Sequence, residues 1–153
     1  MRILLILFLL VQPIISNSQI IIDQAGDNWK ALADSAVKLI KITSPHHYLM
    51  LANNCERITF FTADYSSISG ELGEMCTIYI SRNDVNLGIQ NIAVAIVHES
   101  FHCKITHENK VKLNMDYEEL CAYLSELSFL NLLPAANPML IRHAQSQINN
   151  LTK

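Results

Sequence analysis

The stretch VHESFHCKITHENK, residues 97–110, carries two histidines four positions apart, with a glutamate directly after the first. On an α-helix such positions lie one turn apart on the same face, so His98 and His102 can reach one ion. Neutral imidazoles bind zinc well, and a carboxylate beside them can take a proton from a polarised water molecule. This H-E-x-x-H spacing predicts that His98 and His102 bind Zn²⁺ and that Glu99 is the general base.

A catalytic zinc usually has three protein ligands and one open position, so another ligand must come from elsewhere in the chain. His107 does not fit, because the metzincin pattern H-E-x-x-H-x-x-G-x-x-H requires glycine and then histidine where the sequence has Ile105 and Glu108. Asp116 is a possible ligand but is better explained as a helix cap.

The stretch MDYEELCAYLSEL, residues 115–127, offers two further carboxylates, Glu118 and Glu119. Helical spacing places Glu119 in a row that we expect to face the core, together with Tyr123, Leu127 and Leu130. Glu118 falls in the neighbouring row, with Ala122. Glu119 is therefore the predicted third ligand.

A structural alternative exists for Glu119. Asp116 as N-cap with Glu119 three residues later would form a capping box, and acidic residues are favourable in the first turn of a helix. This alternative explains a surface Glu119 but leaves the paired histidines unexplained.

In this segment the chain resembles the gluzincin metallopeptidases, in which H-E-x-x-H on one helix is followed by a glutamate on the next, often as E-x-x-A. The matching residues are His98, Glu99, His102, Glu119 and Ala122, and the resemblance covers residues 89–130 only. It implies that the two histidines and the later glutamate bind zinc, and that the first glutamate is the base. It also implies that the strand before the active helix, here CTIYIS at residues 76–81, forms the edge of the substrate cleft.

Patterns outside the motif predict the elements that must position it. Apolar residues recur at helical spacing from Trp29 to Ile40, with Asp27 placed as the cap, and Ser44 followed by Pro45 begins a second helix. The runs RITFFT and CTIYIS, at residues 57–62 and 76–81, predict two strands, and residues 66–73 predict the loop between them.

The second half of the chain is expected to be helical. Residues 89–105 are apolar on nearly every side, which is typical of a helix in the middle of a domain. Further helices are predicted from Asp116 to about Leu132 and from Asn137 onwards. The expected class is helix-rich α+β and zincin-like, with a small sheet packed on the central H-E-x-x-H helix and a following helix that carries the glutamate.

Residues 1–18 have the pattern of a secretory signal peptide: Arg2, a short apolar run, and small residues up to Ser18. Gln12 and Pro13 interrupt the run before the roughly 17–25 residues that a transmembrane helix needs. We expect cleavage after Ser18, one metallopeptidase domain over residues 19–153, and a secreted or periplasmic protein with no stable membrane association after cleavage. No basic cluster interleaved with aromatic residues is present, so nucleic acid is not an expected partner.

The sequence contains four cysteines, Cys55, Cys76, Cys103 and Cys121, and an even number behind an export signal indicates disulfides. Three pairings are possible. A Cys103–Cys121 bond would join the two motif helices and would leave Cys55 to pair with Cys76. Zinc binding by cysteines is the alternative, but no C-x-x-C pair supports it.

The remaining polar candidates have weaker patterns. Tyr123 is placed to donate to a transition-state oxyanion, although an aromatic residue on an apolar stripe is more often part of the core. His46, His47 and His143 lack ligand spacing and are expected in surface or capping roles, and His107 is expected in a loop.

The sequence thus predicts a small secreted zinc hydrolase, a metallopeptidase that acts on a peptide or protein substrate. The alternative is a disulfide-stabilised extracellular binding module with an inactive or structural metal site. The sequence leaves the cleavage specificity and the oligomeric state open.

Overall fold

The computed structural model describes residues 20–23, 28–108 and 114–153. The predicted signal peptide, residues 1–18, and the predicted cap Asp27 lie outside these ranges. None of the described helices is both long and apolar enough to cross a membrane.

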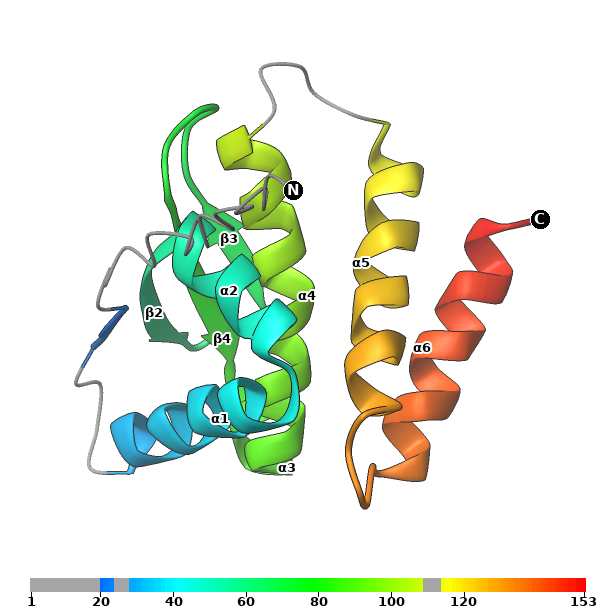
Figure 1. Cartoon of the computed structure of the whole chain (residues 1–153), viewed down its shortest axis with the longest axis horizontal. Coiled ribbons are helices and arrows are strands. Elements are labelled where there is room, and N and C mark those ends of the chain that lie inside the picture. Colours follow the sequence, from blue (N-terminus) through cyan, green and yellow to red (C-terminus); the bar gives the residue numbers. More distant parts are fainter. Residues whose placement is uncertain (1–19, 24–27, 109–113) are drawn as a thin grey trace, which may run out of the picture.

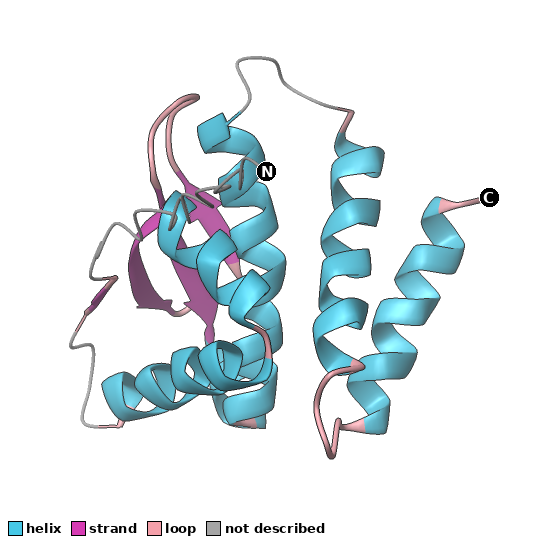
Figure 2. Cartoon of the chain, viewed as in Figure 1, coloured by secondary structure: helices cyan, strands magenta, loops and turns pink. Residues whose placement is uncertain are grey.

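The chain forms a helix-rich α+β fold, as the sequence predicts (Figures 1 and 2). Its elements in order are β1 (Ile21–Ile22), α1 (Trp29–Thr43), α2 (Pro45–Asn54), β2 (Cys55–Phe61), β3 (Ser67–Ser69), β4 (Cys76–Ser81), α3 (Arg82–Leu87), α4 (Ile89–Glu108), α5 (Met115–Leu130) and α6 (Pro138–Leu151).

Helix α4 lies at the centre of the fold. The sheet, α1 and α2 pack against it on one side and α5 on the other, while α6 packs on the outer side of α5 (Figure 1). Its apolar residues, including Ile92, Ile96 and Val97, are buried in the core. Burial of each such side chain stabilises the fold by about 1.5–3 kcal/mol, which explains why this helix is apolar on nearly every side.

The four-stranded sheet has the order β1-β2-β4-β3. Strands β1 and β2 and strands β2 and β4 are parallel, whereas β3 runs antiparallel to β4. Strand β4 therefore lies inside the sheet, and the prediction that residues 76–81 form the edge beside the cleft was wrong. The edge strand that lines the pocket is β3. It has three residues, two of them serines, and is too short and too polar to show a strand pattern.

Asparagine side chains cap the last two helices. The Asn137 side chain accepts from the backbone N–H of Met139 and begins α6, as predicted. The predicted cap Asp116, in contrast, was wrong, because Asn114 caps α5 by accepting from the N–H of Asp116. Asparagine and aspartate are about equally good caps, so the pattern did not distinguish them. The D-x-x-E capping box is thereby excluded as an explanation of Glu119.

The four cysteines are free thiols, so the predicted disulfides are absent. Cys103 is buried against the thiols of Cys55 and Cys76, on the side of α4 that faces the sheet. The Cys121 thiol instead forms a hydrogen bond with the Tyr117 side chain, on the exposed side of α5. The predicted Cys103–Cys121 pair was wrong because the two thiols point away from the interface between α4 and α5.

Candidate metal centre

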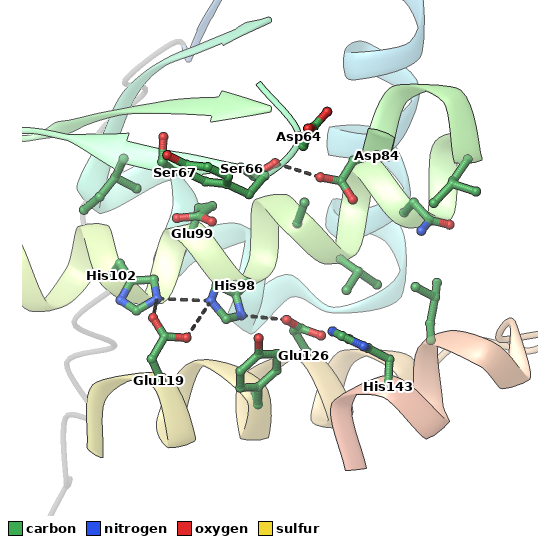
Figure 3. Close-up of a pocket in the computed structure, with 18 of the residues that line it drawn as sticks. Asp64, Ser66, Ser67, Asp84, His98, Glu99, His102, Glu119, Glu126 and His143 are labelled. Atoms are coloured by element: carbon green, nitrogen blue, oxygen red, sulfur yellow. Dashed lines mark hydrogen bonds and ion pairs between the residues drawn. The ribbon is translucent and has the colours of Figure 1, made fainter. Parts of the chain in front are cut away.

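Helix α4 presents His98 and His102 to α5, one turn apart, as the i, i+4 spacing requires (Figure 3). Their Nε2 atoms lie 3.1 Å apart. Both side chains are mostly buried, with 12% and 13% of their surface exposed. Two ring nitrogens are thus directed at one point in the space between the helices.

Glu119 reaches the same point from α5. Its Oε2 lies 3.5 Å from His98 Nε2, and its Oε1 lies 3.4 Å from His102 Nε2. One ligand atom from each of the three residues lies within 4.8 Å of the other two, so the group could hold a metal ion. The structure thereby brings together the three residues that the sequence predicts as ligands.

The other ring nitrogens bond to carboxylates of α5. His98 Nδ1 lies 2.6 Å from Glu126 Oε1. His102 Nδ1 lies 3.0 Å from Glu118 Oε1. An ionised carboxylate can only accept, so each Nδ1 carries the hydrogen, and a neutral ring then has its lone pair on Nε2. Two imidazole nitrogens and one carboxylate form a donor set that suits Zn²⁺.

Electrostatics also favour positive charge here. Burial alone would lower the pKa of His98, but hydrogen bonds with Glu119 and Glu126 outweigh this effect and raise the pKa to about 10. The hydrogen bond with His98 correspondingly lowers the pKa of Glu119. The carboxylates of α5 therefore stabilise a cation at this point between the two helices.

The structure corrects the predicted orientation of α5. Glu118 shares a row with Ala122 and Phe129, and both of these are fully buried. In the row predicted to face the core, Leu130 is buried, but Glu119, Tyr123 and Leu127 are only half-buried. Glu119 reaches the histidines from the side of the helix because α5 packs beside α4.

The contacts of Glu118 and Glu126 with the two histidines were not predicted from the sequence. The two glutamates lie about two turns apart on α5, a helix that is otherwise largely apolar. Only 6% of the surface of Glu126 is exposed. A buried carboxylate requires a hydrogen-bond or ionic partner. The position of Glu126 among apolar residues could therefore have indicated such a contact. Which histidine each one meets depends on the antiparallel packing of α4 against α5, which the sequence does not reveal.

Glu99 is buried, with 7% of its surface exposed, and lines the same pocket as the three candidate ligands. It points from α4 towards β3, away from α5 (Figure 3). Burial raises the pKa of Glu99 to about 7, and the nearby carboxylates of Glu119 and Asp84 add to the effect while His98 opposes it. Such a carboxyl can accept and release a proton near neutral pH.

The pocket has a volume of about 1080 Å³. Residues of α3, α4, α5 and α6 line it together with β3 and the segment before β3. Tyr123 contributes to this lining, and its ring centroid lies 4.8 Å from that of His98. Burial, with the nearby Glu126 carboxylate, raises the pKa of Tyr123 to about 12, so its hydroxyl remains protonated and can donate.

The other histidines differ in part from their predicted roles. His143 is exposed but lines the pocket from α6. His47 is buried rather than on the surface, and its Nδ1 lies 2.6 Å from Ser44 Oγ. His107 belongs to α4 rather than a loop, and its Nδ1 lies 2.8 Å from Asn54 Oδ1 on α2.

His98, Glu99, His102 and Glu119 all line one pocket. The resemblance to gluzincins consists of one short sequence motif and a later glutamate. Comparisons with protein-family models, with curated proteins and with solved structures found no match to this chain.

Proposed function

We propose that this protein is a zinc-dependent hydrolase of zincin type whose substrate is a peptide or protein. One observation carries the proposal: a buried glutamate, Glu99, shares a pocket with the ligand group of His98, His102 and Glu119. A purely structural zinc site has four protein ligands and needs neither an adjacent base nor an open pocket.

Five side chains would prepare the metal site. His98, His102 and Glu119 would hold Zn²⁺, and Glu118 and Glu126 would keep the imidazoles in the orientation and tautomer needed. When bound, zinc supplies a Lewis acid that polarises water and the substrate carbonyl. All three carboxylates come from α5, so the position of this one helix relative to α4 determines the geometry of the site.

Glu99 would act as the general base and then as the general acid. It takes a proton from the attacking water as the new carbon–oxygen bond forms. It then gives this proton to the leaving amine as the carbon–nitrogen bond breaks. The Tyr123 hydroxyl, protonated at neutral pH, would donate to the oxygen on which negative charge develops.

Strand β3 offers a place for an extended substrate. Among the described residues β3 pairs with β4 alone, along one side, and Ser67 and Ile68 line the pocket. A peptide that adds to the free side of such an edge strand satisfies its backbone hydrogen bonds there. We propose that the scissile bond is held in this way between β3 and α5.

The export of the protein remains part of the proposal, on the pattern of residues 1–18. The alternative of a disulfide-stabilised binding module gains nothing from the cysteines, because all four are free thiols.

Metal analysis of the purified full-length chain tests the proposal. We expect about one zinc per chain, retained on gel filtration, and cleavage of a broad peptide digest that stops when a chelator removes the metal. His98→Ala should lose the zinc, whereas His46→Ala, a change of an exposed histidine on α2, should keep it. Absence of zinc after refolding with zinc present would contradict the proposal.

A further inference from the structure

Acidic side chains dominate the pocket. Its lining contains no lysine or arginine among the described residues, and it contains six carboxylates: Asp64, Asp84, Glu99, Glu118, Glu119 and Glu126. Even with Glu99 protonated, five carboxylates remain, so one Zn²⁺, with the histidines neutral, would offset two negative charges and leave three. The pocket therefore stays negative even with the metal bound.

Two of these carboxylates have no part in the proposed metal chemistry. Asp64 lies in the segment before β3, and Asp84 lies in α3. Figure 3 shows both on the side of the pocket to which Glu99 points, across from Glu119 and Glu126. None of the ion pairs in the described part of the chain includes Asp64 or Asp84.

Serine hydroxyls hold the Asp84 carboxylate in place. Its Oδ2 accepts from Ser66 Oγ at 2.8 Å and from Ser81 Oγ at 2.6 Å. Ser66 Oγ in turn accepts from the backbone N–H of Ser81 at 2.9 Å. Both donors are uncharged and leave the negative charge of the carboxylate uncompensated, so a cation that enters the pocket is attracted to it.

Apolar surface lies in the same pocket. Leu87 at the end of α3 and Val94 on α4 belong to its lining. Lysine and arginine combine a charged end with an aliphatic stem that packs on such surface. A neutral or acidic side chain would find no equivalent partner at these aspartates.

We propose that the substrate carries a positively charged group, either a basic side chain or an N-terminal ammonium, that binds at Asp64 and Asp84. The proposal rests on the hydrolase function proposed above and specifies its substrate class. The negative pocket would raise both the encounter rate and the affinity of such peptides, and salt would weaken the effect.

Binding can be measured without turnover. The probes are two pools of random octapeptides, one with arginine and lysine and one with citrulline and acetyl-lysine instead, each with free or acetylated N-termini. The full-length Glu99→Gln protein, loaded with zinc, is immobilised, and retained peptides are counted by mass spectrometry. We expect at least about threefold more retention of cationic peptides at low salt, and a smaller difference at about 0.5 M salt.

The four pools separate the two sources of charge. A basic side chain as the bound group predicts a difference between the arginine/lysine and citrulline/acetyl-lysine pools even after acetylation. A terminal ammonium predicts that acetylation lowers retention in both pools. Equal retention of all four pools, or no retention of any, would overturn the inference.

Variants assign the effect to the two aspartates. Asp64→Asn and Asp84→Asn should each reduce the preference about two- to fivefold. The exposed Asp64 is the cleaner test, because Asp84 also holds the two serines. Asp34→Asn is the control: it removes the same charge on α1, where Asp34 pairs with Lys30 outside the pocket, and should change nothing.

Hydrolysis by the wild-type protein is measured separately on the same pools. Cleavage without preference for cationic peptides would leave the hydrolase function standing and overturn the substrate class. Retention that depends on positive charge, without any cleavage, would support the cationic ligand and contradict the hydrolase.

Discussion

His98 Nδ1 lies 2.6 Å from Glu126 Oε1. Glu126 belongs to α5, the helix that also brings Glu119 to Nε2 on the other side of the His98 ring. The His98 imidazole is therefore held between two carboxylates of α5 that are about two turns apart. Tertiary packing of α4 against α5 fixes this arrangement.

Glu126→Gln should lower zinc affinity about 10- to 100-fold, because the charged acceptor that orients His98 is lost while the ligands remain. Competition with a chromophoric chelator measures the affinity. Glu56→Gln, the same change at an exposed position on β2, is the control and should bind zinc as the wild type does. Equal affinities for the two variants would show that Glu126 has no role at the metal.

Glu119→Ala should reduce zinc affinity more than Glu118→Ala. The first change removes a ligand, whereas the second removes only the partner of His102 Nδ1 and should reduce affinity by about tenfold or more. Isothermal titration with zinc measures the affinity of both variants. A larger loss of affinity in Glu118→Ala would show that Glu118, rather than Glu119, is the ligand.

The cysteines should differ in reactivity. Cys55, Cys76 and Cys103 have no exposed surface, whereas Cys121 is partly exposed. In the folded, reduced protein, alkylation followed by mass spectrometry should modify Cys121 first. After oxidative refolding, peptide mapping should find Cys103 joined to Cys55 or Cys76, its neighbours in the core. A Cys103–Cys121 bond would contradict the observed packing of α4.

The buried His47 should make the fold less stable in acid. Burial, together with the neighbouring His46, lowers its pKa below the usual 6.5. The unfolded chain therefore binds this proton more readily than the folded one. The resulting stability is present above about pH 6.5 and is lost as the pH falls from 6.5 towards the lowered pKa.

Urea unfolding at pH 5 and pH 7.5 measures this effect. His47→Gln should reduce the difference in the free energy of unfolding between the two pH values. His46→Gln, on the neighbouring exposed residue, should leave the difference nearly unchanged. An undiminished difference in the His47 variant would assign the pH dependence to other groups.

Local patterns in the sequence predicted the parts of the site that lie within one helix. The spacing of His98 and His102 is a property of α4 alone, and Asn137 with Pro138 at the start of α6 is equally local. The short strand β3 was missed because its three residues satisfy their hydrogen bonds with β4, and no local preference for a strand reveals this.

Contacts between elements were harder to predict. Whether Cys103 meets Cys121 or Cys76 depends on which face of α4 turns to the sheet. The partners of Glu118 and Glu126 depend in the same way on how α5 lies against α4. A helix that is apolar on nearly every side gives little indication of which face meets which neighbour.

The activity and zinc content of Glu99→Gln, measured together, test the proposed zinc hydrolase most directly. The change keeps the size of the side chain but removes the proton acceptor in the pocket. We predict zinc content and thermal stability close to those of the wild type, with hydrolysis of a cleaved peptide reduced at least about 10²-fold. Full activity of Glu99→Gln on that peptide would contradict the proposed mechanism.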